Sequence, residues 1–221
     1  MRAARSASPD VQPSPAELRL GDLRFHRLVP DDDWMRLSAA VRERFSKRLA
    51  CGETVTYVGR VTNVCFSRLG WWLAQAARLV GGPLPVSRDV GVASAVTVTE
   101  EPATGGQTWT RMYARRRGFP QVIHSSKRFS GPTGLEEYVG RGILMTLDVA
   151  VEDGALTFKS AGYYLKCGKH RFRIPDLFSP GHLTVIHRDL GEGRFLFRLE
   201  LVHPGFGPLI DQSAVFAEAR A

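Results

Sequence analysis

Two adjacent carboxylates, Glu136 and Glu137, could supply acid–base chemistry if one of them enters a cavity. They lie in a segment that reads as a strand, and neighbouring residues of a strand point to opposite faces. Only one of the two can therefore be an interior carboxylate. A buried carboxylate needs a cation and hydrogen-bond donors around it.

Arg111 or Arg141 could neutralise an inward-facing Glu137, and Tyr113 or Tyr138 could donate a hydrogen bond to it. The candidate catalytic residues are therefore Glu137, Arg111 and Tyr113. The alternative is a structural Arg–Glu pair that closes the sheet, and the residue types favour that alternative over catalysis.

Six histidines are scattered without the HxH or HExxH spacing that makes a metal site. His182 and His187 are an odd number of residues apart in one predicted strand, so they face opposite sides. His124 and His203 could each act as a general base, but the sequence does not indicate a Ser-His-Asp triad. We therefore predict no metal site.

The three cysteines, Cys51, Cys65 and Cys167, show no CxxC spacing. An odd count without such spacing is typical of reduced thiols rather than of a disulfide framework. We expect them to be small, buried or half-buried side chains.

The charge balance is basic: 30 Lys and Arg against 22 Asp and Glu give a formal charge of +8. Such a balance favours encounter with nucleic acid, anionic membrane or acidic ligands. Two basic patches are expected, one over residues 107–131 and one over 166–173. Aromatic residues accompany both, but no helix-turn-helix, zinc-finger or RNP signature does, so nucleic-acid binding is not favoured.

Length and composition indicate one globular domain, with 221 residues of which 43% are hydrophobic and 24% charged. Residues 1–20 contain three prolines among Ser, Ala and Arg, which predicts a disordered tail before a single domain over 21–221. No apolar run reaches the roughly 18 to 20 residues of a membrane span. The charged N-terminal segment also lacks the apolar stretch of a secretory signal, so we expect a cytoplasmic protein.

Two helices are predicted near the N-terminal side of this domain. Trp34, Leu37, Val41 and Phe45 recur at helical spacing after three acids, which predicts a helix over 33–49. A β-branched segment over 54–66 predicts a strand.

Ser67 can cap the second helix, which Gly81 and the residues after it end. We expect that helix to pack on the core through an apolar face comprising Leu69, Trp72, Leu73, Ala76, Leu79 and Val80.

After Pro85 the hydrophobic period changes from 3.6 to 2, which predicts antiparallel hairpins in series. About nine or ten strands are too many for a flat sheet of this size. The predicted fold is therefore α+β: a curved, calycin-like antiparallel barrel or half-barrel with two helices. A START-like helix-grip is the alternative fold, and residues 166–181 are predicted to form a surface loop or lid.

Several spaced segments of the chain form a recognisable set: YVGRVTNV at 57–64, SRLGWWLAQAARLVGGPLP at 67–85, DVGVASAVTVTEE at 89–101, WTRMY at 109–113, EYVG at 137–140, FRIP at 172–175 and HPGFGPLIDQSAVF at 203–216. Together these segments resemble the bacterial domain-of-unknown-function family DUF4166 over about residues 25–218. The resemblance implies that Trp109, Arg111, Tyr113, Glu137 and Gly140 occupy recurrent positions of the family. Ser213 and Ala214 stand where the family usually has a glycine.

The same resemblance implies that the domain occurs alone or behind a saccharopine-dehydrogenase-like domain. Association with an NAD(P)-dependent oxidoreductase is therefore a possible partnership by family analogy. This chain has no GxGxxG opening a βαβ unit, so no nucleotide cofactor is expected.

A curved sheet with apolar inward positions, closed on one side by helices, predicts a site for a hydrophobic or lipid-like small molecule. The alternatives are an isomerase- or cyclase-type enzyme acting on a bulky apolar substrate in the same cavity, peripheral binding to anionic membrane or nucleic acid through basic loops, and a barrel filled by its own side chains. The expected ligand-binding residues are Trp109, Arg111, Tyr113, Glu137, Arg141, Met145 and Tyr164.

Overall fold

The computed structural model describes residues 21–49 and 52–219. The predicted disordered tail over 1–20 and Cys51 lie outside the described residues. No helix among the described residues is long and apolar enough to cross a membrane.

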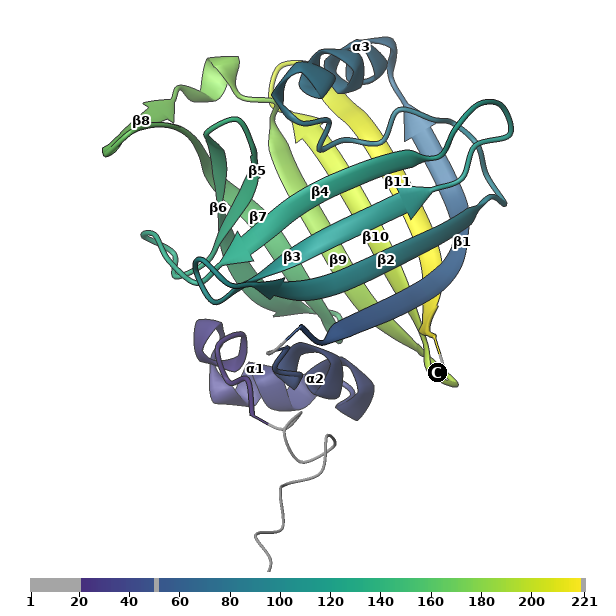
Figure 1. Cartoon of the computed structure of the whole chain (residues 1–221), viewed down its shortest axis with the longest axis vertical. Coiled ribbons are helices and arrows are strands. Elements are labelled where there is room, and N and C mark those ends of the chain that lie inside the picture. The colour runs from purple at the N-terminus through teal and green to yellow at the C-terminus, as the bar shows by residue number, and fades with distance from the viewer. Residues whose placement is uncertain (1–20, 50–51, 220–221) are drawn as a thin grey trace, which may run out of the picture.

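The sheet is a closed antiparallel barrel, which confirms the predicted α+β barrel (Figure 1). Ten strands form it: β1 (Thr54–Phe66), β2 (Ala93–Glu101), β3 (Gly106–Tyr113), β4 (Gln121–Arg128), β5 (Glu136–Gly140), β6 (Ile143–Glu152), β7 (Ala155–Cys167), β9 (His182–Gly191), β10 (Arg194–His203) and β11 (Gly207–Glu218). The β6–β7 ladder closes the barrel, from Ile143 opposite Leu165 to Glu152 opposite Ala155. An eleventh strand, β8 (His170–Ile174), pairs with the end of β7. The helix-grip alternative is wrong, because the sheet closes on itself and the last described element is the strand β11.

Alternation along the strands decides which side chains fill the interior. On β10, Phe195, Phe197, Leu199 and Leu201 are all buried, and the residues between them are half-buried. Alternate residues of such a strand face the interior, so the period of 2 in the sequence identifies the core residues of the strand correctly.

The base of the barrel is covered by the 3₁₀ turn η1 (His26–Leu28) and two short helices, α1 (Asp31–Arg36) and α2 (Ala39–Ser46) (Figure 1). The single helix predicted over 33–49 is wrong, because the chain is extended at Leu37. Ser38 begins the second helix there, its Oγ accepting a hydrogen bond from the Val41 amide at 3.3 Å. The predicted apolar residues of both helices are nevertheless buried, since both pack onto the open base of the barrel.

The opposite end of the barrel carries α3 (Arg68–Ala77), which continues into the 3₁₀ turn η2 (Arg78–Val80) (Figure 1). Ser67 caps α3 as predicted, accepting a hydrogen bond from the Gly70 amide at 3.0 Å. The predicted buried face is partly wrong: Gly70 and Ala74 are buried, whereas Leu69, Trp72 and Leu79 are exposed. These two small residues form the contact face because the helix lies directly on the β11 backbone. A Cβ at Gly70 would overlap the carbonyl oxygen of Leu209.

Successive turns of an antiparallel barrel alternate between its two ends. We call the α3 end the mouth end; it comprises residues 67–92 and the turns at 114–120, 141–142, 168–169, 175–181 and 204–206. The side-chain amide nitrogen of Gln121 donates to the Leu84 carbonyl oxygen at 2.9 Å. The backbone amide of Arg116 donates to the Asp89 carboxylate at 3.0 Å, so both contacts connect segments of this end. The α1–α2 end is called the base end.

Two further predictions need correction. Residues 166–181 are not wholly a loop, because they contain the end of β7, all of β8 and a 3₁₀ turn, η3 (Asp176–Phe178). Cys65 and Cys167 are free, as predicted, but both are exposed because they lie on outward positions near strand ends.

Candidate functional site

The mouth half of the barrel contains a pocket of about 320 Å³. Its outer walls come from α3, η2 and the segment 178–180, and its inner walls come from the inward faces of the strands. Apolar side chains dominate the lining: Leu73, Ala76, Ala77, Val80, Leu84, Met145, Leu183, Val185, Leu199 and Leu201. The volume lies at the lower end of the range of about 300 to 1,000 Å³ for ligand sites.

The base half of the barrel is packed solid by aromatic rings. The His187 ring lies 5.1 Å from Phe45, 5.4 Å from Phe197 and 5.8 Å from Phe158, measured between ring centroids. Two voids beside these rings have volumes of only about 10 Å³ each. The pocket therefore ends at His187, and its opposite walls are those of α3, η2 and the segment 178–180.

Charged side chains lie at this inner end of an otherwise apolar pocket. Glu137 on β5 accepts a hydrogen bond from Lys127 on β4, with Nζ and Oε2 3.1 Å apart. A guanidinium nitrogen of Arg111 on β3 lies 3.7 Å from the other carboxylate oxygen and donates to Ser125 Oγ at 3.1 Å. All three charged residues line the pocket and are buried.

The strand pairing explains why these side chains meet. Lys127 and Glu137 are directly opposite in the β4–β5 ladder, and Lys127 pairs with Gln107 on its other side. Arg111 on β3 is opposite Ile123 on β4. Ile123 precedes Lys127 by four residues, so both face the same side of the sheet. Three adjacent strands thus each contribute one charged residue to one interior surface.

Burial raises the pKa of Glu137, but the charges of Lys127 and Arg111 and a hydrogen bond from Ser125 outweigh it and lower that pKa to about 2. Burial lowers the pKa of Lys127, and Glu137 partly offsets the effect. Burial among aromatic rings lowers the pKa of His187 well below its ordinary value, which keeps its ring neutral at neutral pH. Glu137 is therefore held as a carboxylate.

Two cations share one carboxylate in this cluster, so its formal charge is +1. Within the described part of the chain, Arg111 Nε is buried without a hydrogen-bond partner. A buried donor of this kind is costly unless something accepts from it. The inner end of the pocket can therefore hold a group that accepts hydrogen bonds and carries negative charge.

The pocket brings together four of the residues predicted from the sequence, namely Trp109, Arg111, Glu137 and Met145. Tyr113 is buried too, but it packs with Val61 and Ile123 in a separate cluster and is not among the pocket-lining residues.

Arg141 lies on the exposed β5–β6 turn with a φ of 45°. Tyr164 is half-buried on the outer face of β7, where the Arg171 guanidinium lies 5.0 Å from its ring centroid. Neither of these two side chains lines the pocket.

Tyr163 lines the pocket where Tyr164 was predicted, because β7 contains a bulge. Thr146 is opposite Gly162 and Leu147 is opposite Ser160, so Ala161 is an extra residue without a partner in the ladder. A bulge reverses the facing of every residue beyond it. Strict alternation from Leu156 would have turned Tyr164 inward.

Lys127 and His187 are two polar pocket residues that the sequence analysis did not assign to the site. Lys127 was placed in a surface basic patch, although its alternation with Ile123 and Ser125 would have marked it as inward. The strand QVIHSSKR has too few apolar residues for its inward face to stand out. His187 was recognised as facing the opposite side from His182, and it is buried whereas His182 is exposed.

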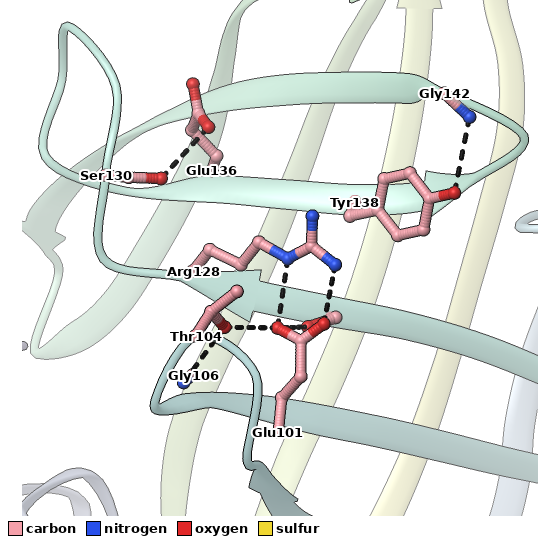
Figure 2. A network of polar contacts seen from close by, with 9 residues as sticks. Glu101, Thr104, Gly106, Arg128, Ser130, Glu136, Tyr138 and Gly142 are labelled. Atoms are coloured by element: carbon pink, nitrogen blue, oxygen red, sulfur yellow. Dashed lines mark hydrogen bonds and ion pairs between the residues drawn. The ribbon is translucent and has the colours of Figure 1, made fainter. Parts of the chain in front are cut away.

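Glu136 does not line the pocket, as the alternation predicts; it is buried in a polar network on the outer face of the sheet (Figure 2). Its carboxylate accepts from Ser130 Oγ at 3.1 Å and pairs with Arg171. Beside it, Arg128 binds Glu101 through two nitrogens, at 2.9 and 2.5 Å. The expected basic patch over 107–131 is therefore reduced to Arg115–Arg117, because these contacts and the pocket take up Arg128, Arg111 and Lys127.

The described residues include no group of three or more His, Cys, Asp or Glu placed to hold a metal ion. The fold and its pocket define a class, that of closed antiparallel barrels with a helix-covered interior site. The chain belongs to the family Domain of unknown function (DUF4166), whose sequence profile matches residues 37–216. Searches of curated proteins and of solved structures returned no match.

Proposed function

We propose that this protein binds a hydrophobic small molecule with an anionic or strongly hydrogen-bond-accepting end group. One observation carries the proposal: Arg111 and Lys127 lie with a single carboxylate at the inner end of an apolar pocket. The end group would accept from the buried Arg111 guanidinium, and the hydrocarbon part would contact the apolar walls towards α3.

Lys127 and Trp109 would orient the end group. The Lys127 ammonium lies 5.0 Å from the Trp109 ring centroid and 5.5 Å from that of Phe158, so aromatic faces and Glu137 already stabilise its charge. A ligand carboxylate would therefore meet a cation that the protein itself holds in place.

An isomerase or cyclase that uses Glu137 has less support. A carboxyl group with a pKa of about 2 is a poor proton donor and a weak general base at neutral pH. Tyr113, the expected hydrogen-bond donor, packs in a separate cluster from the pocket. Binding requires none of the proton transfers that these positions disfavour.

Calorimetric titration of the wild-type protein with dodecanoate and with dodecanol tests the proposal, because the two probes differ only in the end group. We expect dodecanoate to bind at least about tenfold more tightly, as one charge-assisted hydrogen bond predicts. Equal affinity for both probes would remove the end-group part of the proposal, and no binding of either would overturn it entirely.

A pocket-filling variant adds a control on location. Met145→Trp should abolish dodecanoate binding, because Met145 is buried and lines the pocket. Val122→Trp, on an exposed outward position of β4, should leave it unchanged. Unchanged binding in Met145→Trp would place the ligand elsewhere. Native mass spectrometry of the freshly purified protein should show a co-purified small molecule that Met145→Trp lacks.

A further inference from the structure

Exposed apolar side chains gather at one end of this molecule. Eight large apolar residues among the described ones are more than half exposed. Six of them lie in the mouth-end segments, and a seventh, Phe172, lies on β8, which starts at that end. The exception is Met35 on α1. Those seven are between 58% and 90% exposed and include Trp72, Leu79, Phe172, Leu177, Phe178 and Phe206. Isolated exposed apolar residues are ordinary, but a cluster of this kind marks an interaction surface.

These exposed apolar residues, here called the apolar rim, border the pocket at α3, η2 and η3. Phe178, Ala76 and Val80 line the pocket itself, and Leu177, Trp72 and Leu79 are their neighbours on η3, α3 and η2. Trp72 and Leu79 are exposed because the small residues Gly70 and Ala74 take the contact face of α3. The rim therefore follows directly from how α3 packs on β11.

Charge is divided between the two ends in the same way. The mouth-end segments defined above contain eight Arg and Lys residues and only two acids, Asp89 and Asp176. At the base end, residues 21–49, 52–53 and the turns at 102–105, 129–135, 153–154 and 192–193 contain seven Arg and Lys residues and eight acids. The basic excess thus belongs to the end that carries the apolar rim.

Exposed apolar side chains set among basic ones fit the interface of an anionic bilayer, since apolar groups enter the acyl boundary and cations remain at the headgroups. We propose that the mouth end docks on an anionic phospholipid bilayer, with Trp72, Leu79, Leu177 and Phe178 inserted and Arg115–Arg117, Arg141 and Lys169 at the headgroups. In this orientation the pocket opens towards the membrane. A hydrophobic ligand could then enter without crossing water, although docking itself does not depend on the ligand.

Sedimentation of the ligand-free full chain with vesicles tests the docking. The protein should co-sediment with vesicles of phosphatidylcholine and phosphatidylserine, bind pure phosphatidylcholine less, and dissociate as salt shortens the screening length below about 8 Å. Trp72→Ser and Phe178→Ser should each reduce the partition coefficient by about tenfold, the loss expected for one inserted apolar side chain.

Met35→Ser is the matched control, because Met35 is equally exposed but lies at the base end. It should leave vesicle binding unchanged. Equal partition of wild type, Trp72→Ser and Phe178→Ser would overturn the proposal, as would a loss of binding in Met35→Ser of the same size. Preferential binding of a single-stranded oligonucleotide that survives Trp72→Ser would also overturn it in favour of nucleic acid.

The outcome is separable from that of the pocket proposal. A protein that binds dodecanoate but not anionic vesicles contradicts the docking alone. A protein that binds vesicles through Trp72 but takes up neither dodecanoate nor dodecanol contradicts the pocket proposal alone.

Discussion

Glu137 and Lys127 face each other across strands β5 and β4, with Oε2 of the carboxylate 3.1 Å from Nζ of the ammonium. Both side chains are buried, and Arg111 lies on the other side of the carboxylate at 3.7 Å. Such a pair does not of itself guarantee stability, because removing two charges from water is costly. A variant that lacks one partner is expected to lose stability, because the remaining charge is then buried without its partner.

Glu137→Gln should therefore destabilise the protein by about 3 to 5 kcal/mol, as expected when a buried ion pair loses one partner. Two cations would then face each other without a carboxylate between them. Urea unfolding measures the change, and Glu101→Gln is the control, since Glu101 makes its ion pair on the outer surface with a half-buried arginine. A loss below about 1 kcal/mol in Glu137→Gln, the size typical of surface pairs, would contradict the buried cluster.

The same carboxylate predicts how wild-type stability depends on acid. The folded pKa of about 2 lies below the ordinary value of 4.5, so the stabilisation is complete above pH 4.5 and is lost as the pH falls towards 2. The total is about 3 kcal/mol, from about 1.4 kcal/mol for each unit of pKa difference. Glu137→Gln should remove this part of the acid transition, whereas Glu152→Gln, at an exposed ion pair with Lys159, should retain it.

His187 predicts a second acid sensitivity, which begins at a higher pH. Its folded pKa lies well below the ordinary 6.5, so the unfolded chain takes up a proton that the folded protein excludes. Wild-type stability should fall as pH drops below 6.5, with a slope approaching about 1.4 kcal/mol per pH unit. His187→Phe should abolish this slope. His182→Phe, on the exposed side of the same strand, should keep it.

Gly70→Ala separates helix propensity from packing. Propensity alone predicts that alanine stabilises a helix position by about 1 kcal/mol over glycine. The structure predicts the opposite sign, because the new Cβ would overlap the Leu209 carbonyl oxygen and push α3 off β11. Thermal unfolding decides between them. Arg68→Ala on the same helix is the control, and a raised melting temperature in Gly70→Ala would refute the close contact.

Tyr163 and Tyr164 form a matched pair that tests the β7 bulge. Tyr163→Ala should cost about 3 kcal/mol by removing a buried ring from the pocket wall. Tyr164→Ala should cost about 1 kcal/mol or less, because it removes an outer contact with Arg171. Urea unfolding of the two variants should give this order, and the reverse order would mean that the ladder continues without a bulge.

Local sequence patterns predicted side-chain direction correctly where that direction depends only on the geometry of one strand. Trp109 and Arg111 are turned inward by simple alternation on β3, and Glu137 and Glu136 take opposite faces for the same reason. The helix cap at Ser67 was also readable, because capping depends on residues three positions apart. The break between the two helices at Leu37 could not be predicted, because the buried positions on either side of it still fit a single helical period.

The sequence by itself therefore determined the strands, the inward face of most of them and the presence of a curved sheet. Only the tertiary structure decided that β6 pairs with β7, that Ala161 bulges and brings Tyr163 inward, and that Lys127 meets Glu137. It also decided that the base end is filled and the mouth end hollow. The physical reason is that facing within one strand follows from local backbone geometry, whereas register, bulges and filling depend on which distant segments pack together.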